Sequence, residues 1–223
     1  MNIMSIFQEI FYPKYCFFCF KKGRHICSRC LNKFVYYDKP SCPICKGVLR
    51  SKKCFIHKIC MRHSYLDGLF TVVHYDERAK TVLKEAKYHF AYNVLDEIAK
   101  TMKIQYNNFP FAVDYAVPVP LSKARQNWRG FNQAEILARK INWRSREILQ
   151  KEKHTIAQAK LHRSKRLLNL RSSFKLLQHV EVQNKTIVII DDVCTTGATL
   201  QECAKVLKNS GAKKVFALVF AKD

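Results

Sequence analysis

Along most of the chain, short apolar stretches alternate with segments in which apolar residues recur every three or four positions. The first pattern predicts strands and the second predicts helices. Apolar stretches bounded by polar or turn residues predict four strands, at 69–75, 114–121, 187–190 and 214–220. Apolar residues spaced by three or four positions predict four helices, at 77–88, 94–104, 132–141 and 198–209. Strands that alternate with helices are typical of an α/β fold with a mostly parallel sheet flanked by helices.

The strand at 187–190 is followed by the most distinctive polar pattern in the chain. Asp191 and Asp192 stand where this strand should end, and a Thr- and Gly-rich turn then opens the next helix. Ligands of open α/β sheets bind at the carboxyl ends of the strands. The carboxylates can accept hydrogen bonds from sugar hydroxyls, and the turn can offer amides and hydroxyls to a phosphate at the positive end of the helix. The pattern predicts a ribose 5-phosphate site, with the phosphate on Thr195, Thr196, Gly197, Ala198 and Thr199.

Positive charge dominates the composition and is concentrated in one block. The formal net charge is +23, from 40 Lys and Arg against 17 Asp and Glu, and the sequence pI is about 9.8. Between positions 121 and 175, 15 Lys or Arg stand against three acids. Such an excess is typical of proteins that bind a polyanion or strongly anionic ligands. If the polyanion is a single-stranded nucleic acid, Trp128, Phe131 and Trp143 are candidates to stack on its bases.

The apolar pattern argues against an integral membrane protein, because no run approaches the roughly 20 residues that cross a bilayer. Residues 1–12 form a short amphipathic stretch that lacks the basic start and small-residue cleavage site of a signal peptide. We therefore expect a cytoplasmic protein whose cysteine thiols stay reduced.

Cysteine use divides the chain into two modules. Eight of the ten cysteines precede Met61, and none of the next 133 residues is cysteine. We expect a zinc-ribbon module at 1–63, beginning with a short helix, and an α/β domain at 64–223. Two cysteines separated by two residues present both thiolates to one tetrahedral metal ion. Three such pairs occur, Cys16 with Cys19, Cys27 with Cys30, and Cys42 with Cys45.

The first two cysteine pairs predict one structural zinc site with four thiolate ligands, whereas the ligands of a second site are ambiguous. Cys42 and Cys45 open the second site, and Cys54 with Cys60 is one way to complete it. His57 with Cys60 restores the two-residue gap and leaves Cys54 spare, and imidazole is a normal zinc ligand, so His57 is preferred. An interleaved pairing would use the same residues. With so few aliphatic residues, the module is not expected to fold without metal.

A second basic motif lies between the strand at 114–121 and the helix at 132–141. The segment 129–133 reads Arg-Gly-Phe-Asn-Gln and is joined to the strand by a basic loop. Guanidinium groups bind adjacent oxygens of a diphosphate through paired hydrogen bonds. Arg125 and Arg129 are therefore candidate diphosphate ligands.

The order of these motifs resembles the ComF (ComFC) family, phosphoribosyltransferase-like proteins linked to natural competence and DNA uptake. The terminal segment 186–200 is similar to the 5-phosphoribosyl-diphosphate (PRPP) motif of type I phosphoribosyltransferases. The cysteine pairs, the turn at 117–121 and the segment 129–133 complete the likeness. Further residues agree with the family pattern, namely Lys87 with Tyr88, and Gln158, Leu161, Arg166, Asn169 and Phe174. His57 departs from the pattern, because the family typically has cysteine there.

The resemblance implies a double zinc ribbon followed by a type I phosphoribosyltransferase fold, in a protein that handles incoming single-stranded DNA. DNA-uptake proteins are then possible partners. A DNA-handling protein of this kind would bind the strand through basic residues, for which the candidates are Arg129, Arg163, Lys165 and Arg166. We favour this function, combined with a PRPP-type pocket.

Two other classes of function remain open. An active phosphoribosyltransferase would hold PRPP on Asp191 and Asp192, directly or through Mg2+. Its leaving diphosphate would be neutralised by Lys87, Arg125 and Arg129, and its acceptor is not evident from the sequence. A regulator would instead let PRPP or a nucleotide change the affinity for nucleic acid.

Overall fold

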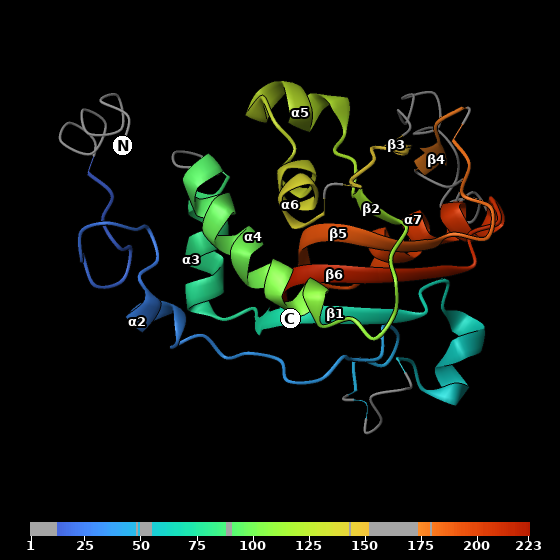
Figure 1. The fold of residues 1–223 in the computed structure, drawn as a ribbon, viewed down its shortest axis with the longest axis horizontal. Helices are drawn as coiled ribbons and strands as arrows, with labels where there is room; N and C mark the ends of the chain where they lie inside the picture. Colours follow the sequence, from blue (N-terminus) through green and yellow to red (C-terminus); the bar gives the residue numbers. More distant parts are fainter. Residues whose placement is uncertain are drawn as a thin grey trace, which may run out of the picture.

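A four-stranded parallel sheet forms the centre of the protein (Figure 1), for which a computed structural model describes residues 13–47, 49, 55–87, 91–142, 144–151, 174–178 and 180–223. The strand order is β1–β6–β5–β2, and the bounds are β1 (Gly68–His74), β2 (Tyr115–Pro118), β5 (Thr186–Cys194) and β6 (Lys214–Lys222). A small antiparallel sheet joins β3 (Leu149–Lys151) to β4 (Phe174–Leu176). The predicted α/β class with a parallel sheet is confirmed.

Helices cover both faces of the central sheet, and the alternation of side chains along each strand explains how. In β5, Val188 and Ile190 face one core, while Ile187 and Ile189 face the other. The first core contains side chains from the helices α3 (Glu77–Glu85), α4 (Ala91–Asn107) and α6 (Gln133–Ile141). The second contains those of α7 (Ala198–Asn209) together with β3 and β4. Among the described residues, no helix is long and apolar enough to span a membrane.

One prediction about the connection between β2 and α6 is wrong, because the basic segment expected as a loop contains the helix α5 (Lys123–Arg129). The Ser122 hydroxyl accepts a hydrogen bond from the amide of Arg125 at 3.4 Å, which caps the start of the helix. Gly130 ends it with a φ of 74°, in the left-handed region that glycine adopts at low cost. The helix places Arg125 and Arg129 one turn apart on one side.

The Cys-rich segment is packed against the sheet as an additional edge. Its backbone runs beside β1, where the amide of Tyr37 donates to Val72 at 2.9 Å and that of Ser41 donates to Leu69 at 3.1 Å. Figure 1 shows this segment, in blue and cyan, passing along the β1 side of the sheet between the helices α2 (Ser28–Leu31) and η1 (Lys58–His63). The predicted boundary at residue 63 stays a prediction.

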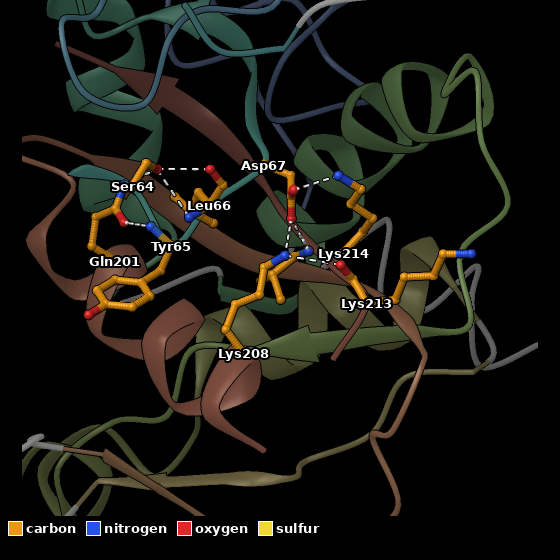
Figure 2. Close-up of polar contacts among 9 residues, drawn as sticks. Ser64, Tyr65, Leu66, Asp67, Gln201, Lys208, Lys213 and Lys214 are labelled. Atoms are coloured by element: carbon orange, nitrogen blue, oxygen red, sulfur yellow. Dashed lines mark hydrogen bonds and ion pairs between the residues drawn. The ribbon is translucent and has the colours of Figure 1, made fainter. Parts of the chain in front are cut away.

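The connection from this segment to β1 is fixed to the carboxyl-terminal part of the chain by Asp67. Its carboxylate accepts hydrogen bonds from the Val215 amide at 2.8 Å and the Lys214 ammonium at 2.9 Å. Lys208 adds an ion pair at 2.7 Å, whereas the ammonium of Lys213 points away from the carboxylate (Figure 2). These bonds hold the start of β1 against the start of β6.

Candidate functional site

A cavity of about 290 Å³ lies at the carboxyl ends of β5 and β2. Seven predicted ligands line it, namely Lys87, Arg125, Arg129, Asp191, Asp192, Thr195 and Thr199. They come from the end of α3, from α5, from the end of β5 and from the turn that opens α7, so the fold gathers residues that are distant in sequence. Thr196, Gly197 and Ala198 belong to the same turn but are not among the lining residues.

The turn before α7 presents its polar groups to solvent. Gly197 has a φ of 81° and is the N-cap of α7, and its carbonyl accepts the first helical hydrogen bond, from Gln201 at 3.0 Å. Thr195, Thr196, Ala198 and Thr199 are exposed. The amides at the start of a helix have no partner within the helix, and the helix dipole favours an anion there. The turn is therefore suited to bind a phosphate.

The two acids are close together and repel one another. The Asp192 amide donates to Asp191 Oδ1 at 2.9 Å, and Lys87 Nζ lies 3.9 Å from Asp192 Oδ2. Burial and the neighbouring Asp192 carboxylate raise the pKa of Asp191 well above its ordinary value. A proton or a cation bound between the carboxylates relieves this repulsion, so the pair is suited to bind a divalent ion or to accept hydrogen bonds from hydroxyls.

The wall of the cavity formed by α5 and the start of α6 contains hydrogen-bond donors that lack an acceptor. The Arg129 guanidinium donates to Gln133 Oε1 at 2.8 Å. Among the described residues, Arg129 Nε and Gln133 Nε2 are buried without a hydrogen-bond partner. Buried donors left unpaired destabilise a protein by about 1–3 kcal/mol each. Oxygens of a bound anion would satisfy both groups.

Asn132 fixes the position of this wall. Its Oδ1 accepts a hydrogen bond from the Ala134 amide at 3.1 Å and caps α6, as expected for a residue of this type in front of a helix. Its Nδ2 donates to the Val119 carbonyl at 3.0 Å. The side chain therefore ties the start of α6 to the end of β2, which keeps Gln133 beside the cavity.

Sequence reasoning missed four polar residues of the cavity, namely Ser122, Asn132, Gln133 and Lys151. The first three lie inside or beside motifs already noted, and Asn132 also caps α6. Lys151 ends the three-residue strand β3, and its ammonium lies 5.3 Å from the ring centre of Phe174. A strand of three residues is too short to show an alternation of apolar and polar positions. Only the positive charge of the surrounding segment could have indicated that Lys151 is a ligand-binding residue.

Cysteine side chains gather in two groups that could each hold a metal ion. The sulfur atoms of Cys16, Cys19, Cys27 and Cys30 lie within 4.8 Å of one another. Although burial opposes the thiolate of Cys16, hydrogen bonds from the amides of Cys27, Phe18 and Cys19 lower its pKa to about 6. Burial and the neighbouring sulfurs raise the pKa of Cys30 to about 12. The lowered pKa of Cys16 favours a thiolate that can bind a cation. The raised pKa of Cys30 means that all four cysteines become thiolates only when a cation is bound.

The second group combines Cys42, Cys45 and Cys60 with the imidazole of His57. Its ligand atoms also lie within 4.8 Å of one another, and Cys45 Sγ is 3.1 Å from His57 Nδ1. The structure therefore brings together the ligand set that includes His57, and Cys54 lies outside the described residues.

Several predicted nucleic-acid contacts also lie outside the described residues, namely Trp143, Arg163, Lys165 and Arg166. Of the other stacking candidates, Trp128 is 66% exposed on α5. Phe131 is partly buried against the core and packs on Tyr92, with the ring centres 5.9 Å apart. Tyr92 is 63% exposed and was not predicted. Trp128 and Tyr92 are thus more accessible than Phe131.

Comparisons with known proteins agree with this geometry. Residues 128–223 match the model of the phosphoribosyl transferase domain. Competence protein F of Haemophilus influenzae is 26% identical over 85% of this chain and 87% of its own. Competence protein ComFC of Streptococcus pneumoniae is 29% identical over 87% of each chain. DNA utilization protein YhgH of Escherichia coli is 27% identical over 85% of this chain and 87% of its own.

These relatives match 85% and 87% of this chain, and the domain match covers the segment that carries α6, β5, the phosphate-binding turn and β6. The paired cysteine groups and the parallel sheet agree with the same assignment. The chain is thus similar to competence proteins of the ComF type over most of its length, and its α/β domain has a phosphoribosyltransferase fold.

Proposed function

We propose that this protein handles single-stranded DNA during DNA uptake and that its cavity binds PRPP or a related ribose phosphate. The observation that carries the proposal is the cavity, in which a helix-opening turn, two carboxylates and four basic side chains surround one space of about 290 Å³. The names of the relatives, which refer to competence and DNA utilization, support the DNA role. The net charge of +23 supports a polyanionic partner.

Each part of PRPP has a chemically matched region of the cavity. The turn at 195–199 would bind the 5-phosphate through backbone amides and hydroxyls. Asp191 and Asp192 would bind the ribose hydroxyls, directly or through Mg2+ carried with the diphosphate. Arg125 and Arg129 would bind the diphosphate, whose oxygens can pair with the donors that are otherwise unsatisfied.

The two cysteine groups would hold structural zinc. Thiolate and imidazole ligands in a four-membered set are typical of Zn2+, and a reducing cytoplasm would keep the thiols available. Zinc would contribute folding free energy to a segment that has small hydrophobic clusters of its own around Cys16 and Cys42.

The single-stranded DNA would pass over α5, which carries the exposed ring of Trp128 and two arginines of the cavity, Arg125 and Arg129. Replacing Trp128 by Ala is expected to weaken the binding of a labelled oligo(dT) by about 5- to 150-fold, because base–aromatic stacking contributes about 1–3 kcal/mol per base. Fluorescence anisotropy at fixed salt measures the dissociation constant. Tyr36→Ala is the matched control, since Tyr36 is 41% exposed and lies on the β1 edge, the sheet edge opposite β2. Equal losses in both variants, or none in Trp128→Ala, would exclude this path.

One experiment separates the three classes of function. Zinc-loaded protein is titrated with PRPP and Mg2+, with single-stranded DNA, and with both, while released diphosphate is measured in the same samples. A DNA-handling protein with a PRPP pocket binds both ligands without sustained diphosphate release. Steady release upon addition of DNA or a nucleobase would identify a transferase, and a change in DNA affinity with PRPP would identify a regulator. Absence of PRPP binding would refute the proposed pocket.

A further inference from the structure

A lysine is buried at the carboxyl end of the sheet, next to the phosphate-binding turn. Lys222 is the last residue of β6 and is paired in register with Cys194, the residue that directly precedes the turn. It is only 2% exposed. Lysine is almost never fully buried unless its charge is compensated. The surroundings of this ammonium group therefore indicate what it does.

The contacts of the Lys222 ammonium come from the segment that carries Cys42 and Cys45 of the second cysteine group. It donates to Ser41 Oγ at 3.0 Å and approaches the Lys46 carbonyl at 3.5 Å. It also lies 5.4 Å from the ring centre of Tyr37. Ser41 directly precedes Cys42, and Lys46 directly follows Cys45. Lys222 therefore contacts both ends of the turn from Cys42 to Cys45, which we call the cysteine knuckle. None of these described contacts is a carboxylate.

A metal in the second group would supply the missing negative charge. One divalent ion with three thiolates and one neutral imidazole carries a net charge of −1. The ammonium of Lys222 lies against the backbone of this knuckle and can balance that charge, whereas a metal-free group of neutral thiols leaves it uncompensated. The lysine and the metal are thus expected to favour each other.

The same knuckle lies next to the phosphate-binding turn. A methyl group placed on Gly197 would be in van der Waals contact with the Pro43 carbonyl oxygen at 3.9 Å and with Cys194 Sγ at 3.7 Å, so only about the width of one methyl group separates the turn from the knuckle. Pro43 is buried between Cys42 and Cys45. A displacement of the knuckle toward Gly197 by more than this small gap must therefore displace the turn.

We infer that Lys222 is a positioning residue that couples the second metal site to the phosphate-binding turn, so that metal in this site and ligand in the cavity strengthen each other's binding. The inference rests on the proposed PRPP pocket. The first cysteine group lies elsewhere, against α4, where the Ile26 amide donates to Glu97 at 2.7 Å, and it serves as an internal control. By reciprocity, PRPP should strengthen metal binding at the second site by the same factor by which that metal strengthens PRPP binding.

The test uses the full chain loaded with zinc. Lys222→Met keeps the length of the side chain and removes the charge, Lys222→Arg keeps the charge, and Lys213→Met controls for loss of an exposed lysine. We expect Lys222→Met to weaken zinc binding at the second site and PRPP binding by about 10-fold or more each, with partial rescue in Lys222→Arg. Zinc affinity is measured by competition with a colorimetric chelator, and PRPP affinity by calorimetry with Mg2+. The first zinc site should be unaffected.

Two results would overturn the inference. One is a Lys222→Met protein that binds PRPP as tightly as the native protein while its second site has lost zinc affinity. The other, obtained on the native protein and independent of whether the variant folds, is an equal zinc affinity of the second site with and without saturating PRPP. If the native protein binds no PRPP at all, the proposed pocket fails first, and the coupling fails with it.

Discussion

Replacing Asp191 and Asp192 together by Asn is expected to weaken PRPP binding by at least about 100-fold. The two carboxylates face the cavity and can bind ribose hydroxyls or Mg2+, and hydrogen bonds to charged groups contribute about 1.5–3 kcal/mol each. Asparagine keeps the shape but provides neither charge nor a good ligand for Mg2+. Calorimetric titration with PRPP and Mg2+ measures the change directly.

The same double variant should fold and should keep its affinity for single-stranded DNA. Asn at these positions removes the repulsion between the acids, so we expect the variant to stay folded, and unchanged affinity for DNA would show that it does. Asp223→Asn is the matched control, because this exposed acid follows the carboxyl end of β6 and its amide donates to Cys194 at 3.2 Å. Undiminished PRPP binding in the double variant would contradict the role assigned to the pair.

Loss of metal from the first cysteine group should have the largest effect on stability. Cys30→Ser removes a buried ligand, and the protein should then bind one zinc ion per chain instead of two. Structural zinc contributes apparent binding free energies of about 10–16 kcal/mol in small zinc-binding peptides, so even partial loss should lower the Tm by about 10 °C. Native mass spectrometry counts the ions, and scanning calorimetry measures the Tm.

Cys203→Ala provides the control for this substitution. Cys203 is also buried, but it lies in α7 and outside both cysteine groups, so this variant should still bind two zinc ions. A Cys30→Ser protein that retains two ions, or melts at the native temperature, would show that the first group is not a metal site.

Sequence reasoning succeeded where the signal is local. The apolar strand, the paired acids and the Thr-Gly turn at 187–199 are contiguous, so the pattern itself predicts a phosphate site. His57 was preferred as a ligand because its two-residue gap to Cys60 is a local constraint on metal geometry. The helix α5 was missed although Ser122 and Gly130 are ordinary start and stop signals for a helix, because none of its seven residues is buried and it therefore has no apolar stripe.

Long-range features could not be obtained in this way. Nothing in the segment around Tyr37 and Ser41 indicates that it extends the sheet beside β1, since that pairing depends on which strand happens to form the edge. The convergence of Lys87, Arg129 and Lys151 on one cavity requires the tertiary fold. The burial of Lys222 is likewise invisible in the sequence, where a lysine directly after the apolar run 215–221 looks like an ordinary polar residue at the end of a strand.

The central claim is that the acids and the turn bind opposite parts of one ribose phosphate. A crystal structure of the zinc-loaded protein with PRPP and Mg2+ tests it most directly. We expect the 5-phosphate to contact backbone amides within 195–199 and the ribose hydroxyls to lie within hydrogen-bond distance of Asp191 or Asp192. PRPP bound elsewhere on the protein, or a cavity that stays without ligand at saturating PRPP, would contradict the account.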